Sequence, residues 1–263
     1  MTMSRISTRV LDMDSPEFRK HIEERNRLVN ERELQRQKAA AEFRDLEAVR
    51  NAAAVKAAED AKFARCGVPA AFLRKTLDDV LPIDPTVSTA VSIARRYIRK
   101  FDEAKTLGAG FVFYGRPGTG KTMTACSLMQ ELMAKDIDCQ YIALWDLLRI
   151  VKVANTFGGD EKQLDRLCRV TLLVLDEVGV QSGTQFEENL LMQVIDSRVR
   201  DMLPTIVITN LAPSSSDEDK QQTLQKKLGF RLFDRICDRC WFIPFRGPSQ
   251  RKGLPPIEQV LGD

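Results

Sequence analysis

The sequence predicts an α/β fold in which a parallel β-sheet carries helices on both faces. From about residue 86 onward, short apolar runs typical of strands alternate with longer segments typical of helices. A glycine-rich turn at residues 115–122 also follows one of the apolar runs and precedes a helical segment. Strands that are separated by helices pair in parallel, because each helix returns the chain to the same end of the sheet.

The predicted elements of this core begin with a helix at about 86–101. Five strands follow, at residues 111–114, 139–143, 171–175, 205–209 and 241–243. The helices between them are predicted at 122–135, 145–153, 161–168, 186–201 and 223–239. Ahead of the core, the segment Cys66-Gly67-Val68-Pro69 interrupts helical sequence. We therefore expect a linker at 65–85 and a globular domain at 86–263.

The N-terminal region, residues 1–64, is predicted to be an α-helical arm. Ser15 and Pro16 suit the cap and the first position of a helix, and neither glycine nor proline follows before Gly67. Residues 17–50 carry nine Lys or Arg and eight Asp or Glu, so the arm is not a basic nucleic-acid segment. Its apolar residues form only a thin stripe. The pattern fits either a solvated helix or an arm that docks on a partner protein.

Overall composition is that of an ordinary globular protein. The 263 residues include 43% hydrophobic and 29% charged residues, with a net charge of +3. That charge is too small to establish nucleic-acid binding, although it leaves room for a local basic channel. We find neither an apolar run long enough for a membrane span nor an apolar signal core, and we expect a cytoplasmic protein.

The glycine-rich turn has the residues of a phosphate-binding P-loop. It reads Gly115-Arg116-Pro117-Gly118-Thr119-Gly120-Lys121-Thr122. The glycines let backbone N–H groups surround a polyphosphate, while Lys121 can reach the outer phosphates and Thr122 can offer its hydroxyl to Mg²⁺. The strand before it and the helix after it provide the required context. The turn therefore predicts binding of a nucleoside triphosphate with Mg²⁺, and we expect ATP as the nucleotide and ADP as its product.

Two carboxylates follow the strand at 171–175. A P-loop protein needs a carboxylate beside its metal ion, and the end of a neighbouring strand can hold one. Asp176 is placed to orient Mg²⁺, and Glu177 to activate the attacking water. The next strand, 205–209, ends at Asn210, whose amide can bond both the γ-phosphate and the water. These three residues are expected at the carboxyl edge of the sheet, with the P-loop.

Three arginines lie four residues apart in the helix predicted at 223–239. Arg231, Arg235 and Arg239 therefore share one helix face. They can form surface salt bridges, Arg231 with Asp234 and Arg235 with Asp238. Alternatively, an arginine here can act as a finger that reaches the nucleotide of an adjacent subunit. The pattern alone leaves both interpretations open.

The six cysteines are expected to be reduced thiols. Cys237 and Cys240 form a C-x-x-C pair, but a structural zinc site normally needs four ligands. No second C-x-x-C is present, and the one histidine, His21, is distant in sequence. We therefore expect no metal site at these cysteines.

Together these stretches resemble the AAA+ ATPases and, within them, the DnaC-type helicase loaders, with the transposition ATPase IstB as a close relative. The resemblance runs from about Cys66 to the C-terminus and is most specific at residues 111–121, 173–181 and 228–235. It implies that Arg235 is a trans-acting finger supported by Arg231, and that Asn210 is the first sensor. It also implies self-association into an AAA+ oligomer on a hexameric replicative helicase, which the N-terminal arm grips.

The resemblance further implies contacts with single-stranded DNA. Loaders use an aromatic residue in the loop after the second core helix, which Phe157 matches, and residues just past the Asp-Glu strand, which Thr184 and Phe186 match. Phe157 can equally anchor its loop. About 20 residues follow the last strand, so the helical lid is short or absent. Arg246 and Arg251 are then the candidates for a second sensor arginine.

The leading functional hypothesis is an ATP-hydrolysing helicase loader that opens the helicase and places it on single-stranded DNA. An IstB-like helper that delivers a transposase to target DNA is the alternative. A third hypothesis is an adaptor that uses ATP only as a binding switch. A small-molecule P-loop kinase is a fourth, against which the arginine-bearing helix argues.

Overall fold

The computed structural model describes residues 16–157, 161–180, 184–214 and 222–251, together with 253 and 259. The chain divides into two compact units, one ending at Glu59 and the other beginning at Asp60. None of the described helices is long and apolar enough to cross a membrane.

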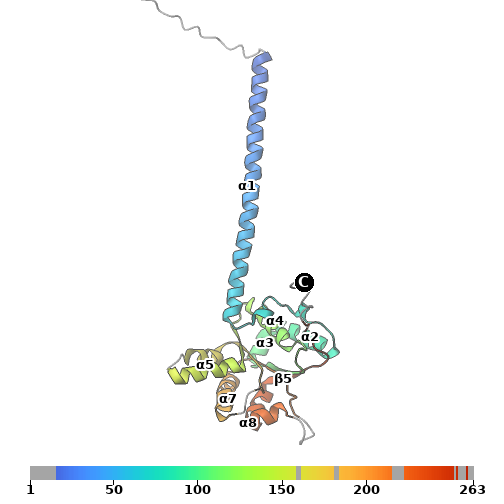
Figure 1. Ribbon diagram of the computed structural model, residues 1–263, viewed down its shortest axis with the longest axis vertical. Coiled ribbons are helices and arrows are strands. Elements are labelled where there is room, and N and C mark those ends of the chain that lie inside the picture. Colours follow the sequence, from blue (N-terminus) through green and yellow to red (C-terminus); the bar gives the residue numbers. More distant parts are fainter. Residues whose placement is uncertain are drawn as a thin grey trace, which may run out of the picture. The chain divides into compact units, whose positions relative to one another are not determined.

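The first element is a helix of 50 residues, α1 (Pro16–Arg65), drawn in blue to cyan in Figure 1. It runs without interruption because its sequence holds no glycine and no proline after Pro16. Large apolar side chains on it stay in solvent: Phe43 is 63% exposed, Leu46 60% and Val49 66%. The helix thus presents apolar surface that the arm itself does not bury.

The second unit contains a five-stranded parallel sheet with the strand order β2-β3-β4-β1-β5. The strands are β1 (Gly110–Gly115), β2 (Cys139–Ala143), β3 (Leu172–Asp176), β4 (Thr205–Thr209) and β5 (Cys240–Phe245). All five predicted strands are present, and their ends differ from the prediction by at most two residues. The predicted α/β fold is confirmed.

Helices cover both faces of this sheet, as the alternation of strands and helices predicts (Figure 1). One face carries α2 (Pro85–Arg99), α3 (Phe101–Thr106) and α4 (Lys121–Met133). The other carries α5 (Leu144–Phe157), α6 (Glu161–Arg169), α7 (Gln185–Arg200) and α8 (Leu224–Arg239). Successive residues of β1 serve opposite cores, because side chains alternate along a strand: Phe111 and Phe113 pack with the first group, Val112 with the second.

The segment between α1 and α2 is packed against α4. It contains two short 3₁₀ helices, η1 (Ala70–Phe72) and η2 (Leu77–Asp79). Gln130 of α4 holds it in place: its amide accepts from the backbone N–H of Arg74 at 2.8 Å and donates to the carbonyl of Phe72 at 2.9 Å. The linker is therefore fixed to the same body as the sheet.

Helix α8 differs from the prediction at Gly229. An uninterrupted helix was expected there, but Gly229 has φ 75° and ψ 160°, which breaks the helical geometry inside the element. Glycine tolerates this left-handed conformation because it lacks a Cβ atom. Arg231, Arg235 and Arg239 all follow this kink, so they remain on one regular stretch of helix.

Arg198 of α7 is a buried cation that ties this face of the sheet together. Its guanidinium donates to the carbonyls of Leu167 and Val170 at 2.8 Å each and to the carbonyl of Pro204 at 2.7 Å. It also donates to the hydroxyl of Thr205 at 2.8 Å. Burial lowers its pKa to about 10. The side chain satisfies carbonyls where α6, β3 and β4 begin or end, so its role is structural.

Candidate nucleotide-binding site

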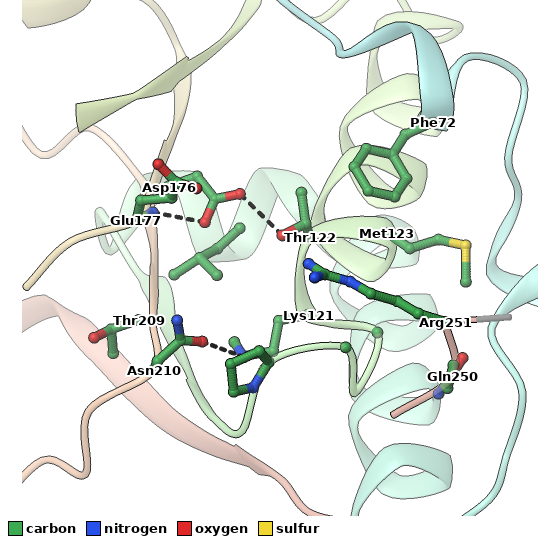
Figure 2. Close-up of a pocket in the computed structure, with 14 residues that line it drawn as sticks. Phe72, Lys121, Thr122, Met123, Asp176, Glu177, Thr209, Asn210, Gln250 and Arg251 are labelled. Carbon is green, nitrogen blue, oxygen red and sulfur yellow. Dashed lines mark hydrogen bonds between the residues drawn. The ribbon is translucent and has the colours of Figure 1, made fainter. Parts of the chain in front are cut away.

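The candidate site lies at the carboxyl edge of the sheet, where β1, β3 and β4 end. Parallel pairing sets the ends of these strands beside one another: Tyr114 is level with Thr209, and Leu175 with Val207. The turn after β1, the carboxylates at the end of β3 and the residue after β4 therefore converge, as the sequence predicts. Figure 2 shows this convergence around one pocket, which has a volume of about 280 Å³.

The turn from Gly115 to Gly120 adopts a backbone that only glycine accommodates at several positions. Gly118 has φ 79° and Gly120 φ 98°, both in the left-handed region. A Cβ atom on Gly118 would also lie 2.1 Å from the hydroxyl oxygen of Ser249. Helix α4 begins at Lys121, so its N-terminal N–H groups face the pocket. Such a loop and helix end suit an anion such as a phosphate chain.

Lys121 is only 5% exposed, and three acceptors surround its ammonium group. The Nζ atom donates to the carbonyls of Gly115 at 2.7 Å and Arg116 at 2.8 Å, and to Oδ1 of Asn210 at 2.9 Å. Burial lowers the pKa of Lys121 to about 8, partly offset by the negative charge of Asp176. The site therefore holds a desolvated cation whose neighbours are neutral oxygens, and this favours an anionic ligand.

Asp176 is also 5% exposed and accepts hydrogen bonds on both oxygens. Oδ2 accepts from the hydroxyl of Thr122 at 2.9 Å and from the hydroxyl of Tyr141 at 2.8 Å. Oδ1 accepts from the backbone N–H of Glu177 at 2.6 Å. Figure 2 shows the carboxylate facing Thr122 across the pocket. A carboxylate and a hydroxyl at this separation are the oxygen ligands that suit Mg²⁺ beside phosphates.

Glu177 and Asn210 line the same pocket and are both exposed to it. Glu177 has φ 59°, an unusual conformation for a residue with a side chain, in the bend that follows β3. Asn210 follows directly after β4 and reaches Lys121 with its side-chain oxygen. The structure thus brings together the P-loop, both carboxylates and the amide that the sequence predicts to meet.

The segment after β5 closes the pocket from the other side. The backbone N–H of Gln250 donates to the carbonyl of Gly118 at 2.7 Å, and its side-chain amide donates to the carbonyls of Leu81 at 3.0 Å and Thr119 at 3.2 Å. Arg251 lines the pocket, and Figure 2 shows its guanidinium extending toward Thr122. Arg246 instead lines a separate hollow beside Gly115. Of the two candidate second-sensor arginines, Arg251 is the one at this pocket.

Apolar side chains form one end of the pocket. Phe72 of η1 and Met123 of α4 line it, on the side away from Asp176 and Asn210 in Figure 2. The pocket therefore has a polar end, suited to phosphates and a cation, and an apolar end that a flat ring can contact.

Arg231 and Arg235 do not line this pocket, and both are exposed. Arg235 pairs with Asp196 of α7, with 3.1 Å between Nε and Oδ1, rather than with Asp238. Asp238 pairs instead with Arg239, at 3.1 Å. Of the surface salt bridges considered, the one for Arg235 therefore forms with Asp196 in place of Asp238, because α8 packs on α7 and Asp196 offers an acceptor from the neighbouring helix.

The three residues considered for DNA contacts lie elsewhere. Thr184 caps α7: its hydroxyl accepts from the N–H of Glu187, whose carboxylate accepts from the N–H of Thr184. Phe186 is half-buried and packs against the core on the α7 side of the sheet. Phe157 is the last residue of α5, and its side chain lies outside the described part of the structure.

The cysteines are free thiols. Burial raises the pKa of Cys240 to about 12, and it also raises the pKa of Cys237. Within the described residues, no group of three or more His, Cys, Asp or Glu could hold a metal ion.

Several residues that line the pocket were not predicted from the sequence, among them Phe72, Met123 and Gln250, and neither was Tyr141, which bonds to Asp176. Tyr141 carries a weak signal, a phenolic hydroxyl in a strand where Gln140 is the other strongly polar side chain. Gln250 and Phe72 come from irregular segments far from the P-loop in sequence, and no pattern marks them.

The fold and the pocket define a P-loop nucleotide-binding protein. Comparison with known proteins agrees: the family of IstB-like ATP binding proteins matches residues 100–254, more than half of the chain. The chain therefore belongs to this family. It is also 33% identical over 149 residues to the replicative helicase loader DnaC of Escherichia coli strain K12. That match spans 56% of either chain, so it covers little more than half the length of the relative.

Solved structures show the same fold. The crystal structure of the DnaC helicase loader matches with a TM-score of 0.60 at 22% identity, covering 68% of this chain and 100% of the other. The crystal structure of DnaI matches with a TM-score of 0.57 at 22% identity, covering 70% and 94%. At this identity the likeness shows the fold alone, a parallel sheet with helices on both faces.

Proposed function

We propose that this protein is an ATP-hydrolysing loader of the hexameric replicative DNA helicase. Residues 1–64 would form the helicase-binding arm, residues 65–85 the linker and residues 86–263 the AAA+ ATPase domain. The observation that carries the proposal is the 33% identity over 149 residues to a replicative helicase loader. The exposed apolar residues of α1 give the ATPase a separate surface for a partner.

The pocket residues suit Mg²⁺-ATP in named roles. The loop from Gly115 to Gly120 and the N-terminus of α4 would hold the phosphates, with Lys121 exchanging its carbonyl acceptors for phosphate oxygens. Thr122 and Asp176 would hold Mg²⁺, which supplies positive charge at the β- and γ-phosphates. Phe72 and Met123 suit the adenine ring, because they form the apolar end of the pocket.

Hydrolysis requires a base for the attacking water and stabilisation of the charge that develops. Glu177 is exposed in the pocket and follows the metal-binding carboxylate, so it is placed to accept a proton from water. Asn210 would orient that water and sense the γ-phosphate while holding Lys121. Arg251, which extends into the pocket from the same chain, would neutralise phosphate charge as a second sensor.

Arg235 would act on the nucleotide of a neighbouring subunit, with Arg231 in support. Both arginines are exposed and neither lines the pocket of its own chain, as a trans-acting finger requires. The proposal implies self-association on the helicase. The pair with Asp196 would then hold Arg235 until a neighbouring phosphate displaces the carboxylate, because phosphate carries more charge.

Contacts with single-stranded DNA remain part of the proposal. Phe157 at the end of α5 is the best candidate for base stacking, which is worth about 1–3 kcal/mol per base. Thr184 and Phe186 have structural tasks as a cap and a core residue, so a DNA role for them would involve their exposed edges.

A transposition helper is the second candidate, and the name of the matching family favours it. The partner distinguishes the two functions. A loader binds a hexameric helicase, whereas the helper binds a transposase and brings it to target DNA. The ATPase site is compatible with either.

The deciding experiment is a pull-down of purified hexameric replicative helicase by the full-length protein. Replacing Phe43 and Leu46 with glutamine removes apolar surface from α1 while keeping a good helix former. We expect this double variant to lose helicase capture and to keep nucleotide binding. Leu107→Gln is the control, because Leu107 is 57% exposed but lies outside the arm. Capture that survives in the double variant, or that is absent in the wild type, would contradict the proposal.

A further inference from the structure

Tyr141 places a hydroxyl group against the carboxylate of Asp176 from a neighbouring strand. It lies on β2 level with Val174 of β3, and Asp176 is two residues beyond Val174, so the two side chains share a face of the sheet. The hydroxyl donates to Oδ2 of Asp176 at 2.8 Å, and Tyr141 is only 8% exposed. The ring belongs to the core beneath α4. Its packing therefore sets the position of the hydroxyl.

The bond from Tyr141 is one of three that orient the carboxylate. Thr122 donates to the same Oδ2 at 2.9 Å, and the N–H of Glu177 donates to Oδ1 at 2.6 Å. Thr122 would become a ligand of Mg²⁺, and Glu177 follows Asp176 in the chain. Of the three partners, Tyr141 is the one that belongs neither to α4 nor to the end of β3, because it lies on β2. It thus relates the carboxylate to the position of β2.

Strand β2 is an edge strand, and the chain just after α1 pairs with it at Tyr141. The N–H of Tyr141 donates to the carbonyl of Cys66 at 2.8 Å. Gly67 lies so close that a Cβ atom on it would be 2.2 Å from the carbonyl oxygen of Tyr141, and its φ is +82°. The junction Cys66–Gly67 is therefore in direct contact with the peptide groups on both sides of Tyr141.

The end of α1 holds this junction against the ATPase domain. Lys62 donates to the carbonyl of Met133 at 3.2 Å, and Asp60 forms an ion pair with Arg74 at 2.7 Å. A displacement of the last turn of α1 would move Cys66–Gly67, which directly follows that turn and contacts Tyr141.

We propose that Tyr141 is a positioning residue for the metal-binding carboxylate Asp176, and that it transmits the position of the Cys66–Gly67 junction to that carboxylate. This inference rests on the proposed role of Asp176 in binding Mg²⁺ with ATP. It assigns to β2 a coupling function: displacement of the arm's end changes how tightly the pocket holds Mg²⁺-nucleotide.

The test measures binding of a fluorescent, non-hydrolysable ATP analogue as Mg²⁺ is titrated. Tyr141→Phe keeps the ring and removes the hydroxyl. Loss of a group that orients a metal ligand costs 10- to 100-fold in metal affinity, so we expect the Mg²⁺ concentration at half-maximal effect to rise about tenfold. Binding without Mg²⁺ should be unchanged.

Tyr97→Phe is the matched control. Its hydroxyl is also buried and donates at 2.8 Å, but to the carbonyl of Ala109 and not to the Asp176 carboxylate. It should lower thermal stability about as much as Tyr141→Phe and leave the Mg²⁺ titration unchanged. An unchanged titration in Tyr141→Phe, or an equal shift in Tyr97→Phe, would overturn the positioning role.

Gly67→Ala tests the link to the junction, because the added methyl must push the junction away from β2. We expect this variant to shift the Mg²⁺ titration in wild-type background and to add nothing to Tyr141→Phe. Equal shifts in both backgrounds, or no shift in either, would overturn the coupling. These readouts need neither hydrolysis nor a helicase, so they can fail while the loader function holds, and the reverse.

Discussion

The ammonium group of Lys121 donates a hydrogen bond of 2.9 Å to the side-chain oxygen of Asn210, joining the P-loop to the end of β4. The two residues are 89 positions apart in the chain. Asn210 is one of the hydrogen-bond acceptors of Lys121. A phosphate oxygen that attracts the ammonium group therefore also changes the hydrogen bond between Lys121 and Asn210.

Replacement of Lys121 with alanine is expected to weaken ATP binding by about 10- to 100-fold. The lost interaction is a charge-assisted hydrogen bond worth about 1.5–3 kcal/mol, and each 1.4 kcal/mol is about a factor of ten. Asn210→Ala should weaken binding by less than about tenfold, because its amide is neutral, and should abolish most hydrolysis. Titration with a fluorescent ATP analogue measures both affinities. Lys135→Ala, two residues beyond the end of α4, is the control, and an equal loss there would contradict the assignment.

Replacement of Glu177 with glutamine is expected to preserve ATP binding and to reduce hydrolysis by at least about 100-fold. Glutamine keeps the shape of the side chain but cannot accept a proton from water, and general-base catalysis contributes about 10²–10⁴ in rate. Release of inorganic phosphate measures the effect. Glu131→Gln, ten residues along α4 from Lys121, serves as control. Helicase loading that continues at the wild-type level in Glu177→Gln would favour the adaptor that uses ATP as a switch.

Substitutions of Arg235 and of its partner Asp196 are expected to have opposite effects on ATP hydrolysis. Arg235→Ala should bind ATP normally and lose hydrolysis in the assembled state, because the finger is missing. Asp196→Ala frees Arg235 from its partner and should retain or raise hydrolysis. Mixing Arg235→Ala with Lys121→Ala should restore part of the activity, since a hybrid interface combines an intact pocket with an intact finger. Absence of rescue at every mixing ratio would argue against action in trans.

Arg198 is predicted to matter for stability alone. Arg198→Leu leaves the carbonyls of Leu167, Val170 and Pro204 without their donor in the core, and unsatisfied buried acceptors cost about 1–3 kcal/mol each. We expect the free energy of unfolding to fall by roughly 3 kcal/mol or more in chemical denaturation. Arg200→Leu, on the same helix but with its side chain 69% exposed, should change it by less than about 0.5 kcal/mol. Similar losses in both variants would refute the assignment.

The order of strands and helices could be predicted from the sequence because each element carries its own periodicity. The proximity of the carboxyl ends of β1, β3 and β4 could also be predicted, because parallel strands end at the same edge of a sheet. Lys121, Asp176 and Asn210 all lie at or shortly after such strand ends. The parallel arrangement of the strands was therefore enough to predict that they lie close together.

The residues that could not be predicted depend on contacts between segments that no local pattern relates. Tyr141 reaches Asp176 only because β2 pairs with β3 in one particular register. Asp196 meets Arg235 because α7 and α8 pack at one particular offset, and Gln250 meets Gly118 through an irregular segment. The break at Gly229 follows from a backbone conformation that glycine permits but does not require.

The walls of the nucleotide pocket run from Phe72 to Arg251 along the sequence. During translation these lining residues are synthesised in that order. The carbonyl of Gly118 therefore gains its hydrogen bond from the N–H of Gln250 only after nearly the whole domain has been synthesised. The arm helix, by contrast, is complete by residue 65. If α1 binds a partner as proposed, a nascent chain would expose that binding segment before its nucleotide pocket is complete, and the order of synthesis would separate partner recruitment from ATP use.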